Sequence, residues 1–380
     1  MELIKKFTST AIILFVGLVI GLIALEVLLR ILPVSITGIA REIPLMADSD
    51  IAFRHKPNQS TVYSTQCYSV PMSTNSAGFR DGEWNEVQRV AVLGDSFMEG
   101  VAVGDGQDFS SLLERLLGVP VMNLGQASFG TAAELKVYEK FVRSKKPGVV
   151  ILMAYTENDI DDNDCTNNTG PNGTIGAPCG VVEDGIVSFP NNYYSVSGNH
   201  ALRSFLREHC YLCRLIRNAR ISSIVGEKVD VSPPSSREVG WTVTREALSR
   251  LKTAVEADGA RLIVSSVPSY RMMISNNTDA VFSDESRFMQ IVNELGIEFI
   301  PLAPVFIDYQ REHNLPDPYF SYSCDGHWNP LGHDLAASAI GSYLIGIDPI
   351  SPTPKEILGE SGYGAIYNGG IYVPPSYEVQ

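Results

Sequence analysis

The chain has 380 residues, 44% of them hydrophobic and 19% charged, which gives ample length for a full core and excludes intrinsic disorder. Its 29 Lys and Arg against 43 Asp and Glu leave a net charge of −14, which argues against a surface that neutralises nucleic-acid phosphates. The composition also excludes collagen, a coiled coil and a polytopic membrane protein.

Residues 1–33 are predicted to form a membrane anchor. No charge lies between Lys6 and Glu26, and Phe7–Leu32 is long enough for a membrane-spanning helix, which needs roughly 20 apolar residues. Glu26 and Arg30 lie one helical turn apart and can pair at the far interface. The alternative is a cleaved signal peptide, but no small-x-small cleavage site follows the apolar core. The lysines before the span favour an extracytoplasmic body, periplasmic or at the cell surface.

Six cysteines fit an exported chain, in which disulfides close loops: Cys67, Cys165, Cys179, Cys210, Cys213 and Cys324. The Gly/Pro-rich segment between Cys165 and Cys179 makes these two the first predicted pair. Cys210 and Cys213 pair less readily, because a helical setting would strain a bond across three residues. Reduced, buried thiols are the alternative. No second Cys or His pair at zinc spacing is present, so no metal is predicted.

From residue 89 onward, short apolar runs alternate with segments of helical apolar spacing, which predicts a parallel sheet covered by helices on both faces. The predicted strands are Val90–Leu93, Val119–Leu124, Val149–Ala154, Arg261–Val267 and Glu298–Leu302. The predicted helices are Phe109–Leu117, Ala132–Ser144, Arg245–Ala257, Glu285–Leu295 and Leu331–Ile345.

Three other segments complete the predicted organisation. Residues 34–88 form a turn-rich lead-in without helical periodicity, before a domain at 89–346. That domain carries an insertion at about 161–240, within which Leu202–Ile216 is predicted to be helical. Residues 347–380, rich in Pro, Gly, Tyr and Ser, are predicted to run extended over the surface.

Polar residues with catalytic potential follow the predicted strands, where ligands of parallel sheets bind. Gly94-Asp95-Ser96-Phe97 follows the first strand, Asn123-Leu124-Gly125-Gln126-Ala127-Ser128 ends the second, and Thr156-Glu157-Asn158-Asp159 follows the third. Cys324-Asp325-Gly326-His327-Trp328-Asn329 precedes the last helix. These segments supply a nucleophile, hydrogen-bond donors and a base with its orienting acid, the groups that acyl transfer requires.

In this order, the four segments resemble the signature blocks of the SGNH (GDSL-type) esterase and lipase family. Asn75–Asp81 is similar to the lead-in of its membrane-anchored bacterial members. The resemblance implies a flavodoxin-like three-layer α/β/α sandwich. It also implies the site: Ser96 as nucleophile, His327 as general base, Asp325 as the orienting acid, and an oxyanion hole formed by the Asn158 side chain and the backbone N–H groups of Ser96 and Ser128.

The sequence departs from the family pattern at three positions. Phe97 stands where Leu is usual, Ser128 stands where the second block usually has Gly, and Thr156 stands where the third block usually begins with Gly. Ser128 can donate its backbone N–H only if the loop does not need a conformation restricted to glycine. Gly125 is the alternative oxyanion donor, and Gly130 is a second nearby substitute.

The bland interpretations are a Ser96 that only caps a helix, an Asn123 that only ties a loop, and an Asp159–Asp164 run that forms an acidic surface or a calcium-like cluster. His333 is a rival to His327 but has no Asp directly before it. The four segments taken together favour catalysis.

We therefore expect a serine esterase that hydrolyses O-acyl esters, O-acetyl groups among them, of a glycan or small substrate outside the cytoplasm. Its expected partners are the ester, such as an acylated polysaccharide, and the membrane; neither nucleic acid nor a cofactor is expected. Standard α/β-hydrolase, P-loop, dinucleotide-binding and His-Glu-x-x-His motifs are missing from the sequence. The alternatives are an O-acyltransferase, a lipase, or a non-catalytic glycan-binding protein on the same fold.

Overall fold

The computed structural model describes residues 2–32, 43–65, 67–85, 88–168, 176–191, 193, 210–213, 215–216, 237–274, 279–316 and 318–346. The predicted extended tail and most of the predicted helix Leu202–Ile216 lie outside these residues.

Five parallel strands form the central sheet in the order β11-β10-β7-β5-β6. They are β5 (Val90–Gly94), β6 (Val121–Gly125), β7 (Val149–Ala154), β10 (Arg261–Ser266) and β11 (Glu298–Ile300). In chain order this is the 2-1-3-4-5 arrangement of flavodoxin-like folds, so the predicted fold class is confirmed. The apolar runs predicted these strands because a parallel strand is buried on both faces.

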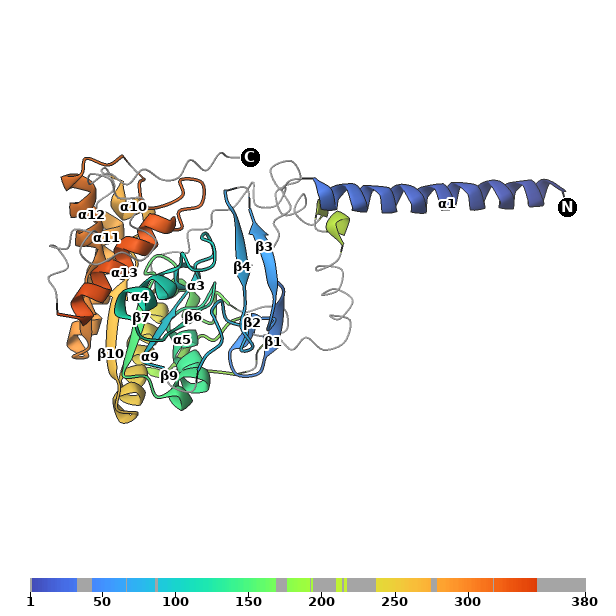
Figure 1. Cartoon of the computed structure of the whole chain (residues 1–380). Helices are drawn as coiled ribbons and strands as arrows, with labels where there is room; N and C mark the ends of the chain where they lie inside the picture. The colour runs from blue at the N-terminus through green and yellow to red at the C-terminus, as the bar shows by residue number, and fades with distance from the viewer. Residues whose placement is uncertain are drawn as a thin grey trace.

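Helices cover both faces of the sheet, giving three layers (Figure 1). Alternate strand residues point to opposite faces. Leu93 and Leu152 pack in one core with α5 (Thr131–Val137), α9 (Arg237–Ala257) and α11 (Asp279–Glu294). Val92 and Ile151 pack in the other core with α4 (Phe109–Leu117), α12 (Leu302–Glu312) and α13 (Pro330–Leu344).

Four helical predictions need correction. The predicted helix Ala132–Ser144 is α-helical only to Val137 and continues as a π-turn, Tyr138–Val142, and a 3₁₀ turn, Arg143–Lys145. Helices α9 and α11 begin earlier than predicted, at Arg237 and Asp279. Helix α12 was not predicted, because Pro304 marks a break when it is taken alone. In the first turn of a helix, however, proline is tolerated, since the N–H it lacks has no intrahelical acceptor there.

The lead-in forms two antiparallel hairpins that the sequence analysis did not predict. The hairpins pair β1 (Leu45–Asp48) with β2 (Ala52–His55), and β3 (Ser60–Ser64) with β4 (Ser69–Ser73). The remaining short elements are α3 (Ser96–Glu99), α6 (Asp159–Asp162), α10 (Tyr270–Met273), β8 (Val181–Glu183) and β9 (Ile186–Ser188).

The motif Asn75–Asp81 connects the lead-in to the sheet domain through hydrogen bonds. The Asn75 side chain accepts the N–H groups of Ala77 and Phe79, both at 3.0 Å, which fixes a tight turn. Beyond the turn, buried Arg80 donates to the Glu99 carbonyl at 3.2 Å. Asp81 accepts the Asn123 N–H at 2.8 Å and so caps the outer edge of β6. The lead-in therefore belongs to the folded body.

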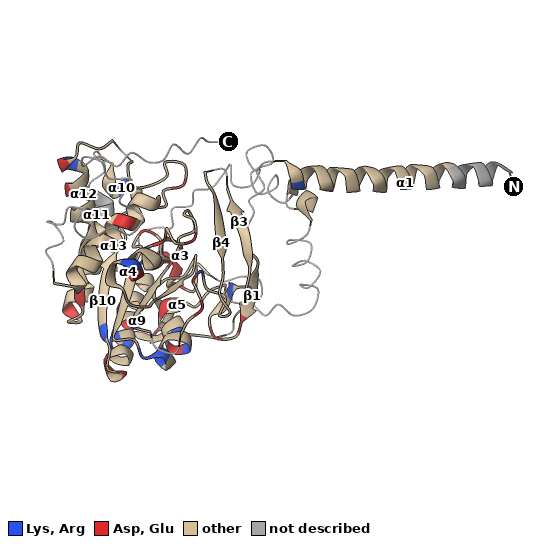
Figure 2. Ribbon diagram, in the orientation of Figure 1, with Lys and Arg blue, Asp and Glu red and all other residues tan. Residues whose placement is uncertain are grey.

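Helix α1 (Glu2–Ile31) projects away from the body, and it carries no charged residue between Lys6 and Glu26 (Figures 1 and 2). By length and composition its segment Ile12–Ile31 could cross a membrane. Almost none of this segment is buried against the rest of the protein. Arg30 pairs with Glu26 at 3.1 Å, as the sequence suggested. Glu26 also accepts the N–H groups of Tyr211 and Leu212, each at 2.9 Å.

The six cysteines lie as three pairs at disulfide distance: Cys67 with Cys324, Cys165 with Cys179, and Cys210 with Cys213. The Cα atoms of Cys165 and Cys179 are 5.0 Å apart, within the limit of about 7 Å for a bridge. The predicted first pair is therefore compatible with the structure.

Candidate active site

The predicted nucleophile and oxyanion side chain follow two adjacent strands. Ser96 comes directly after β5, and Asn158 comes shortly after β7, the strand that pairs with β5. In the 2-1-3-4-5 order, the chain turns to opposite sides of the sheet after these two strands. This switch point is where such sheets bind ligands.

The turn around Ser96 is shaped by its neighbours. Asp95 is buried and accepts the Phe97 N–H at 2.9 Å, which caps α3. Gly94 is required here, because a Cβ atom would lie 2.4 Å from the Met98 Cγ atom. Gly100, with φ of 73°, ends the short helix. Ser96 is thus presented on a tight strand-to-helix turn, with its side chain partly exposed.

Ser96, His327 and Asp325 lie next to one another in this order. The Ser96 Oγ is 2.8 Å from His327 Nε2. The other imidazole nitrogen, Nδ1, is 3.4 Å from Asp325 Oδ2, and the Asp325 carboxylate also accepts the His327 backbone N–H at 3.0 Å. The structure therefore brings together the three residues whose proximity the sequence predicted.

The His327 ring is held by a ring contact with Phe97 and by the hydrogen bonds of its own loop. It packs against Phe97 with ring centroids 4.9 Å apart. Its loop is closed by the Tyr322 N–H, which donates to the His327 carbonyl at 2.8 Å, and by Gly326, whose φ is 84°. The next residue, Trp328, is fully buried and donates to the Pro268 carbonyl at 3.1 Å. The buried tryptophan anchors the loop that carries the imidazole.

The Asp325 carboxyl is held ionised. Partial burial acts to raise its pKa, but the hydrogen bonds and charge of His327, together with a hydrogen bond from Tyr68, outweigh burial and lower the pKa below its ordinary value. An ionised acid beside Nδ1 favours the tautomer whose Nε2 can accept a proton from Ser96.

His333, the rival histidine, serves the fold. Its Nδ1 accepts the Phe109 N–H at the start of α4, at 3.2 Å, from within α13. Burial lowers the pKa of His333 to about 3, with the charges of Arg80 and His327 acting in the same direction. A neutral histidine that caps a buried helix end is not available to Ser96.

The loop after β6 offers an unused backbone donor at Ser128. Gly125 N–H donates to Asn123 Oδ1 at 2.9 Å, and Ala127 N–H donates to Glu99 Oε2 at 2.6 Å. Gln126 and Phe129 N–H groups donate to backbone carbonyls at 3.0 and 3.2 Å. Of these neighbours, Ser128 alone has an N–H without an acceptor among the described residues.

Two sequence expectations about this loop are answered. Ser128 has φ of 68°, the left-handed conformation that glycine favours and that a residue with a side chain can also adopt. Gly125 does not serve as the alternative donor, because Asn123 already accepts its N–H. Its glycine identity has another reason: a Cβ atom would lie 2.0 Å from the Glu99 nitrogen.

Asn158 precedes α6, and its side-chain oxygen is buried without a hydrogen-bond partner among the described residues. Thr156 is buried beside it. Glu157 accepts the Tyr155 hydroxyl at 3.1 Å. The Asn158 side-chain oxygen therefore does not contribute a hydrogen bond to the described part of the fold.

The sequence did not indicate the buried pair His55 and Glu99. His55 Nε2 lies 2.8 Å from Glu99 Oε1, while Glu99 Oε2 holds the Ala127 N–H. Burial opposes ionisation of Glu99, but the charge and hydrogen bond of His55 lower its pKa below the ordinary value. This pair joins the lead-in to the loop that carries Ser128. The one available signal was the position of Glu99 in the first turn after Ser96.

Three buried carboxyls lie behind the turn. Burial raises the pKa of Asp95 to about 6, and burial together with the charge of Asp95 raises the pKa values of Glu134 and Asp159 well above their ordinary range. Within the described residues, no group of three or more His, Cys, Asp or Glu side chains is arranged to hold a metal ion.

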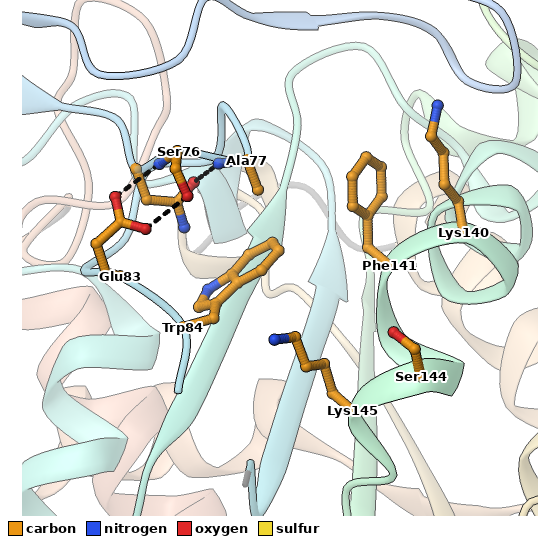
Figure 3. Close-up of a pocket in the computed structure, with 9 residues that line it drawn as sticks. Ser76, Ala77, Glu83, Trp84, Lys140, Phe141, Ser144 and Lys145 are labelled. Atoms are coloured by element: carbon orange, nitrogen blue, oxygen red, sulfur yellow. Dashed lines mark hydrogen bonds between the residues drawn. The ribbon is translucent and has the colours of Figure 1, made fainter. Parts of the chain in front are cut away.

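A separate cavity of about 240 Å³ lies between the lead-in and the turns that follow α5 (Figure 3). Trp84 and Phe141 face it, with Ser76, Glu83 and Lys145 around the rim. Glu83 accepts the Ser76 N–H at 2.7 Å. None of its lining residues is a predicted catalytic residue.

Comparison with known proteins gives structural likeness only. No protein-family model matches the chain, and no curated protein matches it. A protein assigned to the G-D-S-L lipolytic family from Desulfitobacterium hafniense shares 12% identity over 67% of this chain and 98% of its own, with a TM-score of 0.37. A variant of an acetyl xylan esterase from Geobacillus stearothermophilus shares 15% identity over 71% of this chain and 100% of its own, with a TM-score of 0.39.

A second acetyl xylan esterase shares 13% identity over 67% of this chain and 99% of its own, with a TM-score of 0.39. Likeness at this level adds nothing to the case for an activity. That case rests on the residues of the site.

Proposed function

We propose that the protein is a serine ester hydrolase whose acyl-enzyme forms on Ser96. The observation that carries the proposal is the 2.8 Å contact between Ser96 Oγ and His327 Nε2, with Asp325 beside the opposite imidazole nitrogen. A serine hydroxyl is a weak nucleophile until a neighbouring base accepts its proton, and this contact has the required geometry.

In the proposed reaction, Ser96 Oγ attacks the ester carbonyl carbon while its proton passes to His327 Nε2. The Asp325 carboxylate stabilises the imidazolium that results. When the tetrahedral intermediate collapses, the carbon–oxygen bond to the alcohol breaks and His327 returns the proton to the departing alkoxide. Water then repeats the sequence on the acyl-enzyme, with His327 as its base, and releases the carboxylic acid and Ser96.

The oxyanion of each intermediate would be held by the Ser96 and Ser128 N–H groups and by the Asn158 amide. Among the described residues the Ser128 N–H has no acceptor and Asn158 Nδ2 makes no hydrogen bond, which supports this assignment. Donors fixed in place before the reaction stabilise the charge that develops only in the transition state. His327 and Asp325 keep 25% and 24% of their side-chain surface exposed, which gives water access to the acyl-enzyme.

The proposed substrates are O-acyl esters, O-acetyl esters among them, of a glycan or a small alcohol outside the cytoplasm. The location is supported by the apolar helix α1 and by three cysteine pairs at disulfide distance, since disulfides persist in oxidising compartments. Half-buried Tyr63, Tyr68 and Tyr322 gather beside Asp325 and offer the aromatic surface that a polar, ring-shaped substrate can pack against.

The test is hydrolysis of p-nitrophenyl acetate by the wild type, Ser96→Ala, Asn158→Ala and Ser323→Ala, an exposed serine in the His327 loop. We expect Ser96→Ala to abolish turnover without unfolding the protein, and Ser323→Ala to behave as wild type. Asn158→Ala should lose on the order of 10²–10³ in turnover, as for one oxyanion donor.

Retained turnover in Ser96→Ala would refute the proposal. Adding a polysaccharide acceptor and following acetate release against acetyl transfer distinguishes hydrolysis from transfer. Transfer in preference to hydrolysis would replace the proposed reaction with acyl transfer on the same residues.

A further inference from the structure

The helical turn that carries Ser96 also carries a buried carboxylate that reaches the loop after β6. Helix α3 begins at Ser96 and ends at Glu99, whose side chain is 3% exposed. The Ala127 N–H donates to Glu99 Oε2 at 2.6 Å, and the Gln126 N–H donates to the Gly94 carbonyl at 3.0 Å. Two hydrogen bonds therefore hold the start of this loop against the turn that presents the nucleophile.

Residues 126–129 form a β-turn whose central peptide carries the Ser128 N–H. The turn is closed by the Phe129 N–H, which donates to the Gln126 carbonyl at 3.2 Å. Ala127 has a negative φ and Ser128 has a φ of 68°, which is the combination found in a type II turn. Because these dihedral angles fix the central peptide, they set the direction of the Ser128 N–H within the turn.

The placement of this turn relative to Ser96 depends on Glu99. Ser128 itself is exposed, and the hydrogen bond that closes the turn is internal to it. The contact that reaches from a central residue of the turn to α3 is the one between the Ala127 N–H and the Glu99 carboxylate. A hydrogen bond to an ionised acceptor is roughly twice as strong as one between neutral groups. Glu99 therefore connects the nucleophile and the candidate oxyanion donor.

The lead-in holds Glu99 from the opposite side. A carboxylate removed from water is stable only where it is paired and hydrogen-bonded. Its partner is His55, at the end of β2, whose Nε2 lies 2.8 Å from Glu99 Oε1. Arg80, also in the lead-in, donates to the Glu99 carbonyl at 3.2 Å. The lead-in thus contacts both the side chain and the main chain of Glu99.

Resting on the proposed function, we infer that Glu99 and His55 are positioning residues of the oxyanion hole. Glu99 holds the turn that directs the Ser128 N–H toward the oxyanion, and His55 keeps the Glu99 carboxylate aimed at Ala127. The lead-in therefore completes the oxyanion hole, although it supplies neither the nucleophile nor a donor.

The first experiment compares Glu99→Met with a matched control, Asp48→Leu, in the full chain. Each replaces a buried carboxylate between the lead-in and the body by an apolar side chain. Asp48 is 4% exposed and pairs with Arg54 at 3.0 Å and with Lys140. Among the described residues, its hydrogen bonds and ion pairs reach neither α3 nor the loop after β6.

The readout is kcat/KM for p-nitrophenyl acetate divided by kcat/KM for its thionoester, in which sulfur replaces the carbonyl oxygen. Sulfur is a weak hydrogen-bond acceptor, so oxyanion donors accelerate the ester more than the thionoester. We expect Glu99→Met to lower the ester value on the order of 10-fold, less than the 10²–10³ for loss of a donor, with the thionoester value nearly unchanged. Asp48→Leu should keep the wild-type ratio, because partial unfolding lowers both values equally.

A readout independent of catalysis is hydrogen exchange of the Ala127 amide, followed by mass spectrometry of peptides that cover residues 123–130. Loss of its acceptor should speed exchange in Glu99→Met, whereas Asp48→Leu should exchange as wild type does. Glu99→Gln keeps an oxygen that can accept this N–H. It should therefore recover slow exchange and most of the preference for the ester.

The second experiment adds His55→Phe, which leaves Glu99 in place and removes its partner, and the double variant with Glu99→Met. If His55 acts through Glu99, the losses on the ester overlap, and the double variant is no slower than the slower single variant. Losses that multiply would refute this order of action. Should Glu99→Met fail to fold, the ester to thionoester ratio of His55→Phe decides the inference.

The outcomes separate this inference from the proposed function. An unchanged ratio and unchanged Ala127 exchange in Glu99→Met and His55→Phe, with Ser96→Ala inactive, would overturn the positioning role and leave the esterase intact. Equal losses on ester and thionoester would also overturn it, because they show a general loss of structure. Turnover that persists in Ser96→Ala would overturn the esterase, while Ala127 exchange would still confirm or refute the contact with Glu99.

Discussion

The backbone conformation of Ser128 and the protonation state of His333 could not be predicted from their residue types. Ser128 holds a left-handed backbone conformation with φ of 68°, and His333 remains neutral because it is buried as a helix cap. In both cases the surrounding structure, rather than the side chain, decides what the residue does.

Replacing Ser128 by Gly should stabilise the protein slightly. A residue with a side chain in the left-handed conformation destabilises the folded state by about 1–2 kcal/mol. Glycine removes this strain, but its greater freedom in the unfolded chain offsets about 0.5–1 kcal/mol of the gain. We expect a gain in the free energy of unfolding of up to about 1.5 kcal/mol, measured by urea denaturation. The matched control, Ser249→Gly within α9, should lose stability.

Esterase turnover in Ser128→Gly should stay near the wild-type rate, because the proposed donor is a backbone N–H. A large fall in kcat would show that the Ser128 hydroxyl, and not its backbone, acts in the reaction.

At the scale of elements, the parallel strands and their helices were predictable, because burial on both faces leaves continuous apolar runs such as Val149–Ala154. The meeting of Ser96 and His327 was implied by the family resemblance and not by the strand pattern, since His327 lies between two helices and does not end a strand. The lead-in hairpins were not predictable. Strands such as Leu45–Asp48 are short and alternate only between exposed and half-buried positions, so their apolar pattern is weak.

The partners of the lead-in were hidden for a related reason. His55 with Glu99, and Cys67 with Cys324, are contacts between residues far apart in the chain. The apolar periodicity within a segment does not indicate which distant residue it will contact. The proximity of Cys67 to Tyr68 and of Cys324 to Asp325 is visible in the sequence, but the pairing of the two cysteines is not.

The contact between α13 and α4 should make stability depend on pH. The pKa of His333 is about 3 in the folded protein and near 6.5 when unfolded. Between these values the unfolded chain binds a proton that the folded protein does not, so stability falls as the pH drops below about 6.5 and is independent of this group above it.

In His333→Asn, the Asn oxygen can accept the Phe109 N–H without titrating. The loss in the free energy of unfolding between pH 7 and pH 5 should then be smaller than in the wild type, by up to about 2 kcal/mol. The control, His313→Asn at an exposed position, should keep the wild-type dependence. An equal loss in His333→Asn and wild type would show that His333 is not buried as a neutral group.

For the whole molecule, α1 and the body have separate roles. The helix projects from the body with its apolar side chains exposed, for example Leu14 at 69% and Phe15 at 66% (Figure 1). Exposed apolar surface of this extent in water would be strongly unfavourable, whereas in lipid it is not.

We expect the full chain to stay with the membrane fraction after high-salt washing and to dissolve in detergent. A variant lacking residues 2–32 should be recovered in the aqueous fraction with its esterase turnover intact. Amino-terminal sequencing of the mature protein separates the anchor from a signal peptide: a new amino terminus after residue 32 would contradict the anchor.

The most direct test of the central claim is to find which residue forms the covalent intermediate. The protein is treated with a fluorophosphonate, which phosphonylates activated serines, and the modified peptide is identified by mass spectrometry. We predict a single modification on Ser96 in the wild type and its loss in His327→Gln, because the hydroxyl then has no base to accept its proton. Modification of a different serine, or equal modification of Ser96 in His327→Gln, would contradict the proposed site.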